Sequence, residues 1–228
     1  MTSKASVVFD LDGTLTDPKP GITACIRHAM EQLGRPLPLD ENLDWCIGPP
    51  LQGSFIRLLS DDKQVARAMA LYRERFLHIG MFENSVYAGI SPMLEALAQC
   101  ADLWLATSKP KVFAEKIVAH FGLAVHLKKV YGSELDFSRS DKGELLSYLL
   151  EQEGLDPGKT VMVGDREHDI IGAKKNGLRS IGVLWGYGVE AELVAAGASS
   201  LARTPAELQN QLLAIGFNEI HSPMESSF

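Results

Sequence analysis

"VVFDLDGTLTD", residues 7–17, places two aspartates, Asp10 and Asp12, at the end of a short apolar run. An apolar run without polar alternation is typical of a strand buried on both faces of a sheet. Gly13 follows and lets the chain turn sharply. Two carboxylates at one strand end repel each other unless a cation lies beside them. The stretch therefore predicts a buried strand that carries negative charge to a functional site.

Three more apolar runs end in a small or polar residue: "LWLATS" at Thr107 and Ser108, "TVMVGD" at Asp165, and "SIGVLWG" at Gly186. Helical patterns separate the runs, and they cover residues 91–100, 111–122, 141–154, 168–177 and 204–216. Alternation of strands with helices is typical of a parallel sheet that is covered by helices on both faces. The sequence therefore predicts an α/β fold with a doubly wound parallel sheet.

One stretch, from about Gly21 to Leu77, breaks this alternation because it contains helical patterns and no convincing strand. The helical patterns cover residues 21–34, 39–48, 50–60 and 63–78. A purely helical segment directly after the first strand predicts an inserted all-helical domain. We expect this domain to span residues 18–83, with the α/β core built from residues 1–17 and 84–228. The hinges would lie near residues 16–20 and 84–88.

Composition and charge narrow the class of partner. The formal net charge of −7 disfavours nucleic acid polymers, because phosphate backbones select basic surfaces. The three cysteines form no CxxC pair, so we expect them to be reduced packing residues. No apolar run is long enough to span a membrane, and the run before Asp10 is too short for a signal peptide. We therefore expect a cytoplasmic protein that does not act at a membrane, and we leave open whether it is a monomer or a dimer.

The polar residues at the strand ends form a candidate site. Asp10, Asp12, Thr107 and Asp165 all fall at carboxyl ends of predicted strands. In open α/β sheets these ends share one edge of the sheet, where ligands bind. A hard divalent cation relieves the repulsion between the carboxylates, and an oxygen-rich site with few protein ligands suits Mg²⁺. The sequence therefore predicts a magnesium site, together with a small ligand that the metal binds.

Four motifs in order resemble those of the haloacid dehalogenase superfamily of phosphatases. They are "DLDGTLTD" at residues 10–17, "LATS" at residues 105–108, Lys142 in "RSDKGELL", and "GDREHD" at residues 164–169. Each motif alone is modest evidence, but four in order are specific. The resemblance implies a Rossmann-like core with a helical cap inserted after the first strand. It also implies a phosphatase that acts on a small phosphorylated metabolite.

The resemblance assigns a role to each residue. Asp10 would be the nucleophile and form an aspartyl-phosphate intermediate. Asp12 would protonate the leaving oxygen and then activate water. Thr107 would donate its hydroxyl to the phosphoryl group, and Lys142 would neutralise charge on the nucleophile and the phosphoryl group. The implied metal site uses Asp10, the Asp12 backbone carbonyl, Asp165, and Asp169 in a supporting role.

Substrate-binding residues follow from the same resemblance. Backbone amides at Gly13 would hold phosphate oxygens, and Ser108 lies beside the phosphoryl-binding Thr107. The loop "CIGPPL", residues 46–51, would hang over the site, with Gly48 and Pro49 lining the leaving-group pocket. The alternative is that this loop only joins two helices.

Several of these assignments have a competing interpretation. Lys109 in "TSKP" is the rival of Lys142 as the lysine of the third motif. Thr107 and Ser108 are also candidates for capping the helix that follows them. Asp169 would be favoured at a helix start by the helix dipole alone.

Two stretches resemble one branch of the superfamily, which contains phosphoglycolate phosphatases and bacterial 5′-nucleotidases. They are "VYGSELDFSRSDKGELL" and "GDREHDIIGAKKNGLRSIGVLWGYG". The resemblance implies nucleoside 5′-monophosphates as the first candidate substrates, and phosphoglycolate or another small phosphomonoester as the second. Asp12 argues against a hydrolytic dehalogenase, which lacks the second aspartate. A phosphosugar mutase keeps all four motifs and remains a further alternative.

Overall fold

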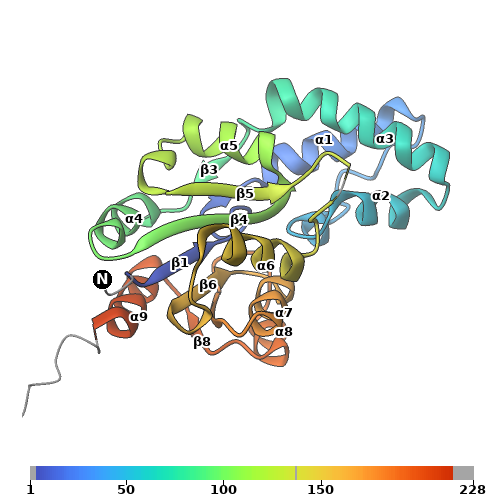
Figure 1. The fold of residues 1–228 in the computed structure, drawn as a ribbon. Coiled ribbons are helices and arrows are strands. Elements are labelled where there is room, and N and C mark those ends of the chain that lie inside the picture. The colour runs from blue at the N-terminus through green and yellow to red at the C-terminus, as the bar shows by residue number, and fades with distance from the viewer. Residues whose placement is uncertain (1–3, 137, 218–228) are drawn as a thin grey trace, which may run out of the picture.

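A six-stranded parallel sheet forms the core of the computed structural model (Figure 1), in the strand order β5-β4-β1-β6-β7-β8. The structure describes residues 4–136 and 138–217, so the ends of the predicted core, 1–3 and 218–228, lie outside it. The strands are β1 (Ser6–Phe9), β4 (Asp102–Pro110), β5 (Lys129–Ser133), β6 (Thr160–Gly164), β7 (Arg179–Val183) and β8 (Ser200–Ala202). The predicted doubly wound sheet is confirmed.

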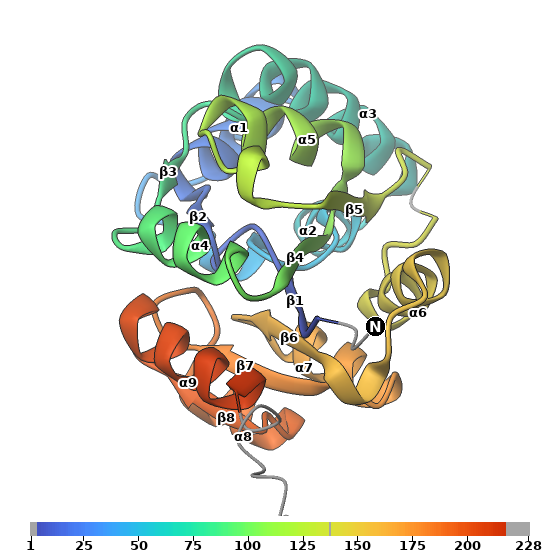
Figure 2. The same ribbon diagram turned by 60° about the vertical axis from the view of Figure 1, so that its left-hand side comes forward.

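Alternate residues of β1 face the two helical layers of the sandwich. Val7 and Phe9 join the cluster of buried side chains that includes α4 (Ile90–Ala98), α5 (Lys111–His120) and α9 (Pro205–Phe217). Val8 joins the opposite cluster, which contains buried leucines of α6 (Lys142–Glu153) and Ala173 of α7 (Glu167–Lys175). Figure 2 shows these two sets of helices on opposite faces of the sheet. Burial on both faces explains why the strand lacks polar alternation.

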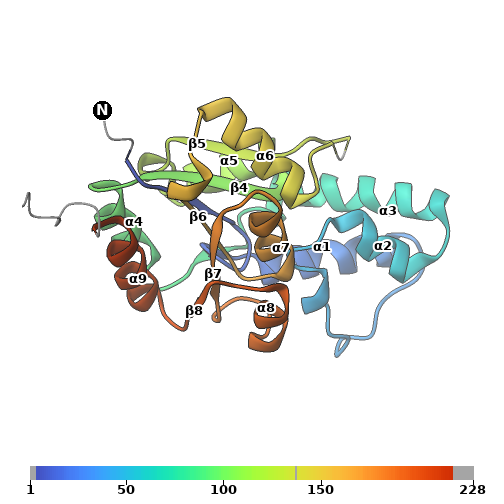
Figure 3. The same cartoon turned by 60° about the horizontal axis from the view of Figure 1, so that its bottom comes forward.

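Three helices follow the first strand and lie beside one another beyond one end of the sheet (Figure 3). They are α1 (Lys19–Gln32), α2 (Leu51–Leu59) and α3 (Asp62–Arg75), and a single π-helical turn, Phe76–Gly80, follows α3. Each of these helices buries one apolar face, as the periodicity predicts. The inserted all-helical segment is therefore present.

The prediction of a helix over residues 39–48 is wrong. This segment contains only one three-residue 3-10 turn, Asp44–Cys46. Its apolar residues do not form one buried face, because Leu39 is 94% exposed. The Arg27 guanidinium fixes the irregular backbone before the turn by donating hydrogen bonds to the carbonyl oxygens of Pro38, Leu39 and Glu41.

Two very short strands connect the helical segment to the sheet. β2 (Thr16–Asp17) pairs with β3 (Ser85–Val86) in antiparallel fashion, with Thr16 opposite Val86. The Asn84 amide also donates a 3.3 Å hydrogen bond to the Thr16 hydroxyl. Both strands fall within the predicted hinges, while the limits of the cap at residues 18 and 83 stay a prediction. The two stretches of chain that enter and leave the helical segment are thus hydrogen-bonded to each other.

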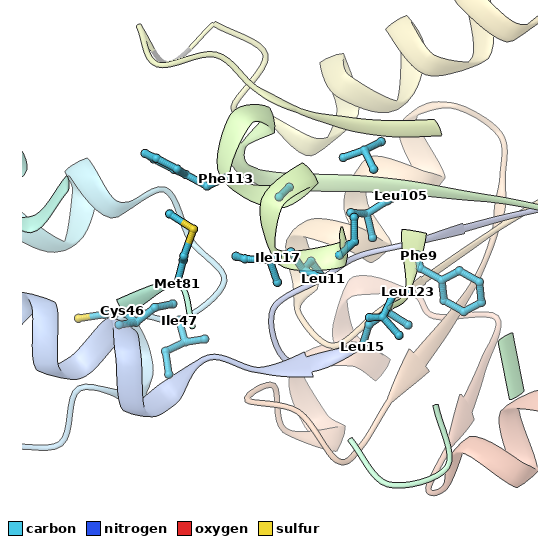
Figure 4. Close-up of a cluster of buried hydrophobic side chains, with 14 of the residues drawn as sticks. Phe9, Leu11, Leu15, Cys46, Ile47, Met81, Leu105, Phe113, Ile117 and Leu123 are labelled. Atoms are coloured by element: carbon cyan, nitrogen blue, oxygen red, sulfur yellow. The ribbon is translucent and has the colours of Figure 1, made fainter. Parts of the chain in front are cut away.

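Buried side chains continue from the sheet into the helical segment without a break. Figure 4 shows Phe9 and Leu105 of the sheet and Phe113 of α5 in one cluster with Cys46 and Ile47 of the helical segment. The Phe113 ring meets the Phe76 ring edge to face, at 5.5 Å between centroids. Such shared apolar burial places the helical segment against the carboxyl edge of the sheet.

No helix among the described residues has the length and apolar character needed to cross a bilayer. The cytoplasmic location and the absence of a nucleic acid partner stay predictions. Whether the protein is a monomer or a dimer stays open.

Candidate active site

The turn after β1 is built around Gly13. Its φ is +87°, and a Cβ at this position would lie 2.2 Å from the Asp165 Oδ2 atom. Glycine is therefore required here both by the backbone conformation and by the close approach of a carboxylate. The turn leaves Asp10 and Asp12 buried, at 5% and 7% exposure. The Asp10 backbone amide donates to the Val163 carbonyl of β6, which fixes the end of the strand.

Three buried carboxylates meet at this edge of the sheet. Oxygen atoms of Asp10, Asp165 and Asp169 all lie within 4.8 Å of one another. Asp165 accepts hydrogen bonds from the Thr14 hydroxyl at 3.2 Å and from the Tyr187 backbone amide at 2.8 Å. The strand-end positions thus converge as the sheet topology predicts.

The electrostatics of this cluster favour a cation. Burial raises the pKa of Asp165 well above its usual value, and the charges of Asp169 and Asp10 raise it further. Burial also raises the pKa of Asp169, although the Lys142 ammonium partly offsets this. Oxygen ligands crowded in a buried site fit the donor set that Mg²⁺ prefers. The side chain of Asp12 is not part of the carboxylate cluster.

Lys142 neutralises two of these carboxylates. Its Nζ atom lies 2.8 Å from Asp10 Oδ1 and 2.7 Å from Asp169 Oδ1, and it donates to the Ala106 carbonyl at 2.8 Å. Burial lowers the pKa of the Lys142 ammonium, but the two carboxylates outweigh burial and raise the pKa above its usual value. Lys142 is therefore a fixed positive charge in contact with Asp10.

Lys109 occupies a different place from Lys142. Its Nζ atom lies 2.6 Å from Asp12 Oδ2 and 4.9 Å from the centre of the Phe76 ring, which belongs to the helical segment. Burial raises the pKa of Asp12, and Lys109 opposes that rise. The geometry favours Lys142 over Lys109 as the neighbour of the proposed nucleophile. Lys109 emerges instead as a partner of Asp12, a role that the sequence pattern did not suggest.

Thr107 and Ser108 lie at an irregularity in the pairing of β4 with β5, where the register shifts between Thr107 and Pro110. Thr107 is buried, and its hydroxyl oxygen accepts a 3.3 Å hydrogen bond from the Lys109 backbone amide. The Ser108 hydroxyl donates to the Ser140 carbonyl at 3.2 Å. Neither residue caps α5, whose N-cap is Pro110. Ser108 therefore anchors the segment that leads to Lys142.

A pocket opens between these residues and the helical segment. Its floor contains Asp10, Asp12 and Thr107, and its wall includes Gly48 and Pro49 of the loop at residues 46–51. Most of the remaining wall is apolar or aromatic and comes from Ile22, Leu51, Met69, Tyr72, Phe76 and Phe113. Gly13 is not among the lining residues, because it packs beneath the pocket against Asp165.

Tyr187 is a further residue that the motifs did not identify. Its backbone amide holds Asp165, and its hydroxyl donates to the Asp17 carboxylate in β2. Gly186 and Gly188 on either side come close to Asp165, where a Cβ would lie 2.4 Å and 1.9 Å from Asp165 atoms. The available signal was the pair of glycines in "WGYG", which marks a close approach of two backbone segments.

The family model described as haloacid dehalogenase-like hydrolase matches residues 7–183 of the chain. The chain belongs to this family. Among its relatives, a 5′-nucleotidase of Pseudomonas aeruginosa is 46% identical over 190 residues, which are 82% of this chain and 86% of that protein. The tyrosine-protein kinase PtkA of Mycobacterium tuberculosis is 38% identical over 183 residues, 80% of this chain and 62% of that protein.

A phosphoglycolate phosphatase of Vibrio parahaemolyticus is 29% identical over 192 residues, 79% of this chain and 84% of that protein. A crystal structure of a predicted phosphatase from Clostridium acetobutylicum matches with a TM-score of 0.88 and 39% identity, and it covers 93% of this chain and 100% of that chain. The chain is therefore a phosphatase of the haloacid dehalogenase-like family.

Proposed function

We propose that this phosphatase hydrolyses phosphate monoesters through a covalent aspartyl-phosphate on Asp10, with Mg²⁺ as cofactor, and that its substrates are nucleoside 5′-monophosphates. The observation that supports the chemistry is the environment of Asp10, which contacts the Lys142 ammonium and faces two further carboxylates. A carboxylate nucleophile that contacts a buried cation is held in one orientation.

The reaction has two steps. In the first, an Asp10 oxygen attacks phosphorus while the bond between phosphorus and the ester oxygen breaks, and Asp12 gives a proton to the leaving alcohol. In the second, Asp12 takes a proton from water, and the water oxygen attacks phosphorus. Inorganic phosphate leaves, and the Asp10 carboxylate is restored.

Three groups assist both steps. Lys142 offsets the negative charge that Asp10 and the phosphoryl oxygens bring together. The Thr107 hydroxyl lies at the pocket floor and would donate to a phosphoryl oxygen. Asp10, Asp165 and the backbone of Asp12, with Asp169 in support, would hold Mg²⁺, which supplies further neutralisation of the transferring phosphoryl group.

The choice of substrate is supported by the pocket wall. Phe76 and Tyr72 stack with 5.3 Å between ring centroids, and both rings belong to the helical segment above Asp10. A nucleoside offers aromatic and apolar surface to such a wall, whereas glycolate offers almost none. The name of the P. aeruginosa relative, 5′-nucleotidase, is consistent with this choice.

Phosphoglycolate is the second candidate, because the positive charges of Lys109 and Arg73 line the same pocket and favour an anionic leaving group. The relative from V. parahaemolyticus carries the name of that activity.

A comparison of kcat/KM values tests the substrate. We expect at least one nucleoside 5′-monophosphate to exceed phosphoglycolate, and we expect the preference to fall when Pro49 and Pro50 are both replaced by glycine. Hydrolysis of an aryl phosphate is the control, because it depends on Asp10, Asp12 and Lys142 rather than on the loop. A preference for phosphoglycolate by about tenfold, or about 1.4 kcal/mol, would overturn the nucleotide assignment and leave the phosphatase intact.

A further inference from the structure

The loop at residues 46–51 owes its position to a side chain of the core. Gly48, Pro49 and Pro50 line the pocket above Asp10, but residues 47–50 belong to no helix and no strand. The Arg166 guanidinium reaches across from the core and donates from Nη1 to the Ile47 carbonyl at 2.7 Å. Arg166 directly follows Asp165 in the chain, so this contact joins the carboxylate site to the loop above the pocket.

The core holds Arg166 firmly from the other side. Its Nε atom donates to Glu192 Oε1 at 2.8 Å, and Glu192 lies on α8 (Glu190–Ala196). Glu192 also accepts from the Glu167 backbone amide at 2.9 Å. The side chains of Arg166 and Glu192 are 16% and 20% exposed, so solvent competes little for these bonds. One edge of the guanidinium is thus fixed to the core while another binds the loop.

The backbone of the loop fits closely against the stem of Arg166. Gly48 has φ +99°, and a Cβ there would lie 2.9 Å from the Arg166 Cγ atom. Any other residue would combine a strained backbone with this contact. Gly48 is therefore needed for packing against Arg166, in addition to its place in the pocket wall.

The size of the pocket makes this contact relevant to catalysis. The cavity measures about 80 Å³, well below the roughly 300–1,000 Å³ of typical ligand sites. The loop at residues 46–51 lines this small pocket, so its position limits which leaving groups fit above Asp10. The hydrogen bond from Arg166 to Ile47 holds the loop in that position.

We infer that Arg166, supported by Glu192, is a positioning residue that fixes the loop at residues 46–51 over Asp10 and thereby sets the discrimination between leaving groups. The inference rests on the proposed use of this pocket by the substrate. Arg166 touches neither the phosphoryl group nor the leaving group in this scheme. It acts through Ile47 and Gly48.

The first test needs no substrate. Arg166→Met keeps the apolar stem against Gly48 but removes the donor to Ile47 and the charge paired with Glu192. We expect amide hydrogen exchange in residues 44–51 to accelerate by about tenfold to a hundredfold, the change that loss of one charged hydrogen bond allows. Glu192→Gln should also accelerate exchange, but by less, because an oxygen acceptor for Arg166 remains. This variant replaces Arg166→Met in the test if Arg166→Met does not fold.

A second ion pair, which also involves a glutamate of α8, supplies the control. Arg203 contacts Glu190 of α8 at 3.0 Å, and both side chains are more than half exposed, at 67% and 53%. Arg203→Met and Glu190→Gln remove the same charges without touching the loop. Exchange in residues 44–51 should stay unchanged in both.

The second test measures discrimination. In Arg166→Met we expect kcat/KM for the preferred ester, divided by kcat/KM for an aryl phosphate, to fall about tenfold. The Mg²⁺ concentration that gives half of the maximal increase in melting temperature should change less than about twofold. Unchanged exchange in the loop would overturn the inference, as would a loss of Mg²⁺ affinity that accounts for all lost activity. A failure of the nucleotide proposal would show in the substrate ranking of the unmodified enzyme and would leave the exchange result standing.

Discussion

Replacing Lys142 by methionine removes a charge from the most crowded part of the active site and keeps a side chain of similar length. Two carboxylates lose their ammonium partner, and their side chains are only 8% exposed in Asp10 and 3% exposed in Asp169. Removing one member of a buried ion pair costs about 3–5 kcal/mol, because the remaining charge is left uncompensated. That is a large part of the roughly 5–15 kcal/mol by which most domains are stable.

The loss in free energy of unfolding caused by Lys142→Met should depend on pH. Burial already raises the pKa of Asp169 above its ordinary value of 3.8, and the largest influence that opposes this rise is the charge of Lys142. Without Lys142 the folded-state pKa rises further above the unfolded value, so the folded state binds a proton that the unfolded state has released. The resulting stability is fully present below the unfolded pKa and is lost as pH rises through the folded pKa. The cost of Lys142→Met should therefore be smaller near pH 5 than near pH 8.

Urea unfolding followed by circular dichroism measures this cost, with excess chelator and separately with Mg²⁺. Mg²⁺ should recover part of the loss, because it would face the same carboxylates, and kcat should still fall by about 10²–10³-fold. Lys109→Met is the matched control, since Lys109 is also buried but contacts one carboxylate, that of Asp12. Equal unfolding midpoints for Lys142→Met and the unmodified protein at both pH values would refute this account of the site.

Four further outcomes are expected. Asp10→Asn should abolish turnover with an unchanged circular dichroism spectrum, and beryllium fluoride trapped on another side chain would refute its role as nucleophile. Asp12→Asn should slow turnover by ~10²–10⁴-fold, measured under single-turnover conditions, and a normal rate would exclude Asp12 as the acid. Chelation should stop phosphate release and Mg²⁺ should restore it while the fold persists, whereas full activity in chelator would rule out the metal. Gly13→Ala should weaken the stabilisation by Mg²⁺ in a thermal shift assay, because its Cβ would press on Asp165.

The parts of the fold that the sequence predicted are those with strong local patterns. Apolar runs such as Val161–Val163 identify central strands, because burial on both faces leaves no position for a polar residue. The short elements were missed. β8 has three residues at the edge of the sheet, and α8 has only seven, with Val194 exposed on it. Gly197 at φ +94°, directly after α8, was the one local signal of a helix end in this region.

The sequence predicted that residues at strand ends converge, but it did not identify residues that are brought in by long-range contacts. Asp10, Thr107 and Asp165 are brought together by the topology, which the strand pattern already implies. The pairing of Tyr187 with Asp17 joins positions 170 residues apart, and no local pattern announces it. The contact of Arg166 with Ile47 is of the same kind, because a guanidinium at the surface of most proteins is simply solvated.

The central position of β1 also governs when the enzyme gains its activity. β1 is made first, yet its neighbours β4 and β6 follow much later in the chain, and Ser6 pairs with Thr160. The bond from Thr14 to Asp165 spans 151 positions. Contacts of such long range form slowly, because the intervening chain must be ordered before they contribute. A nascent chain on the ribosome thus carries Asp10, the proposed nucleophile, early but has no carboxylate cluster until β6 and α7 emerge. In refolding experiments, phosphatase activity should return after the helical signal, in the slowest phase.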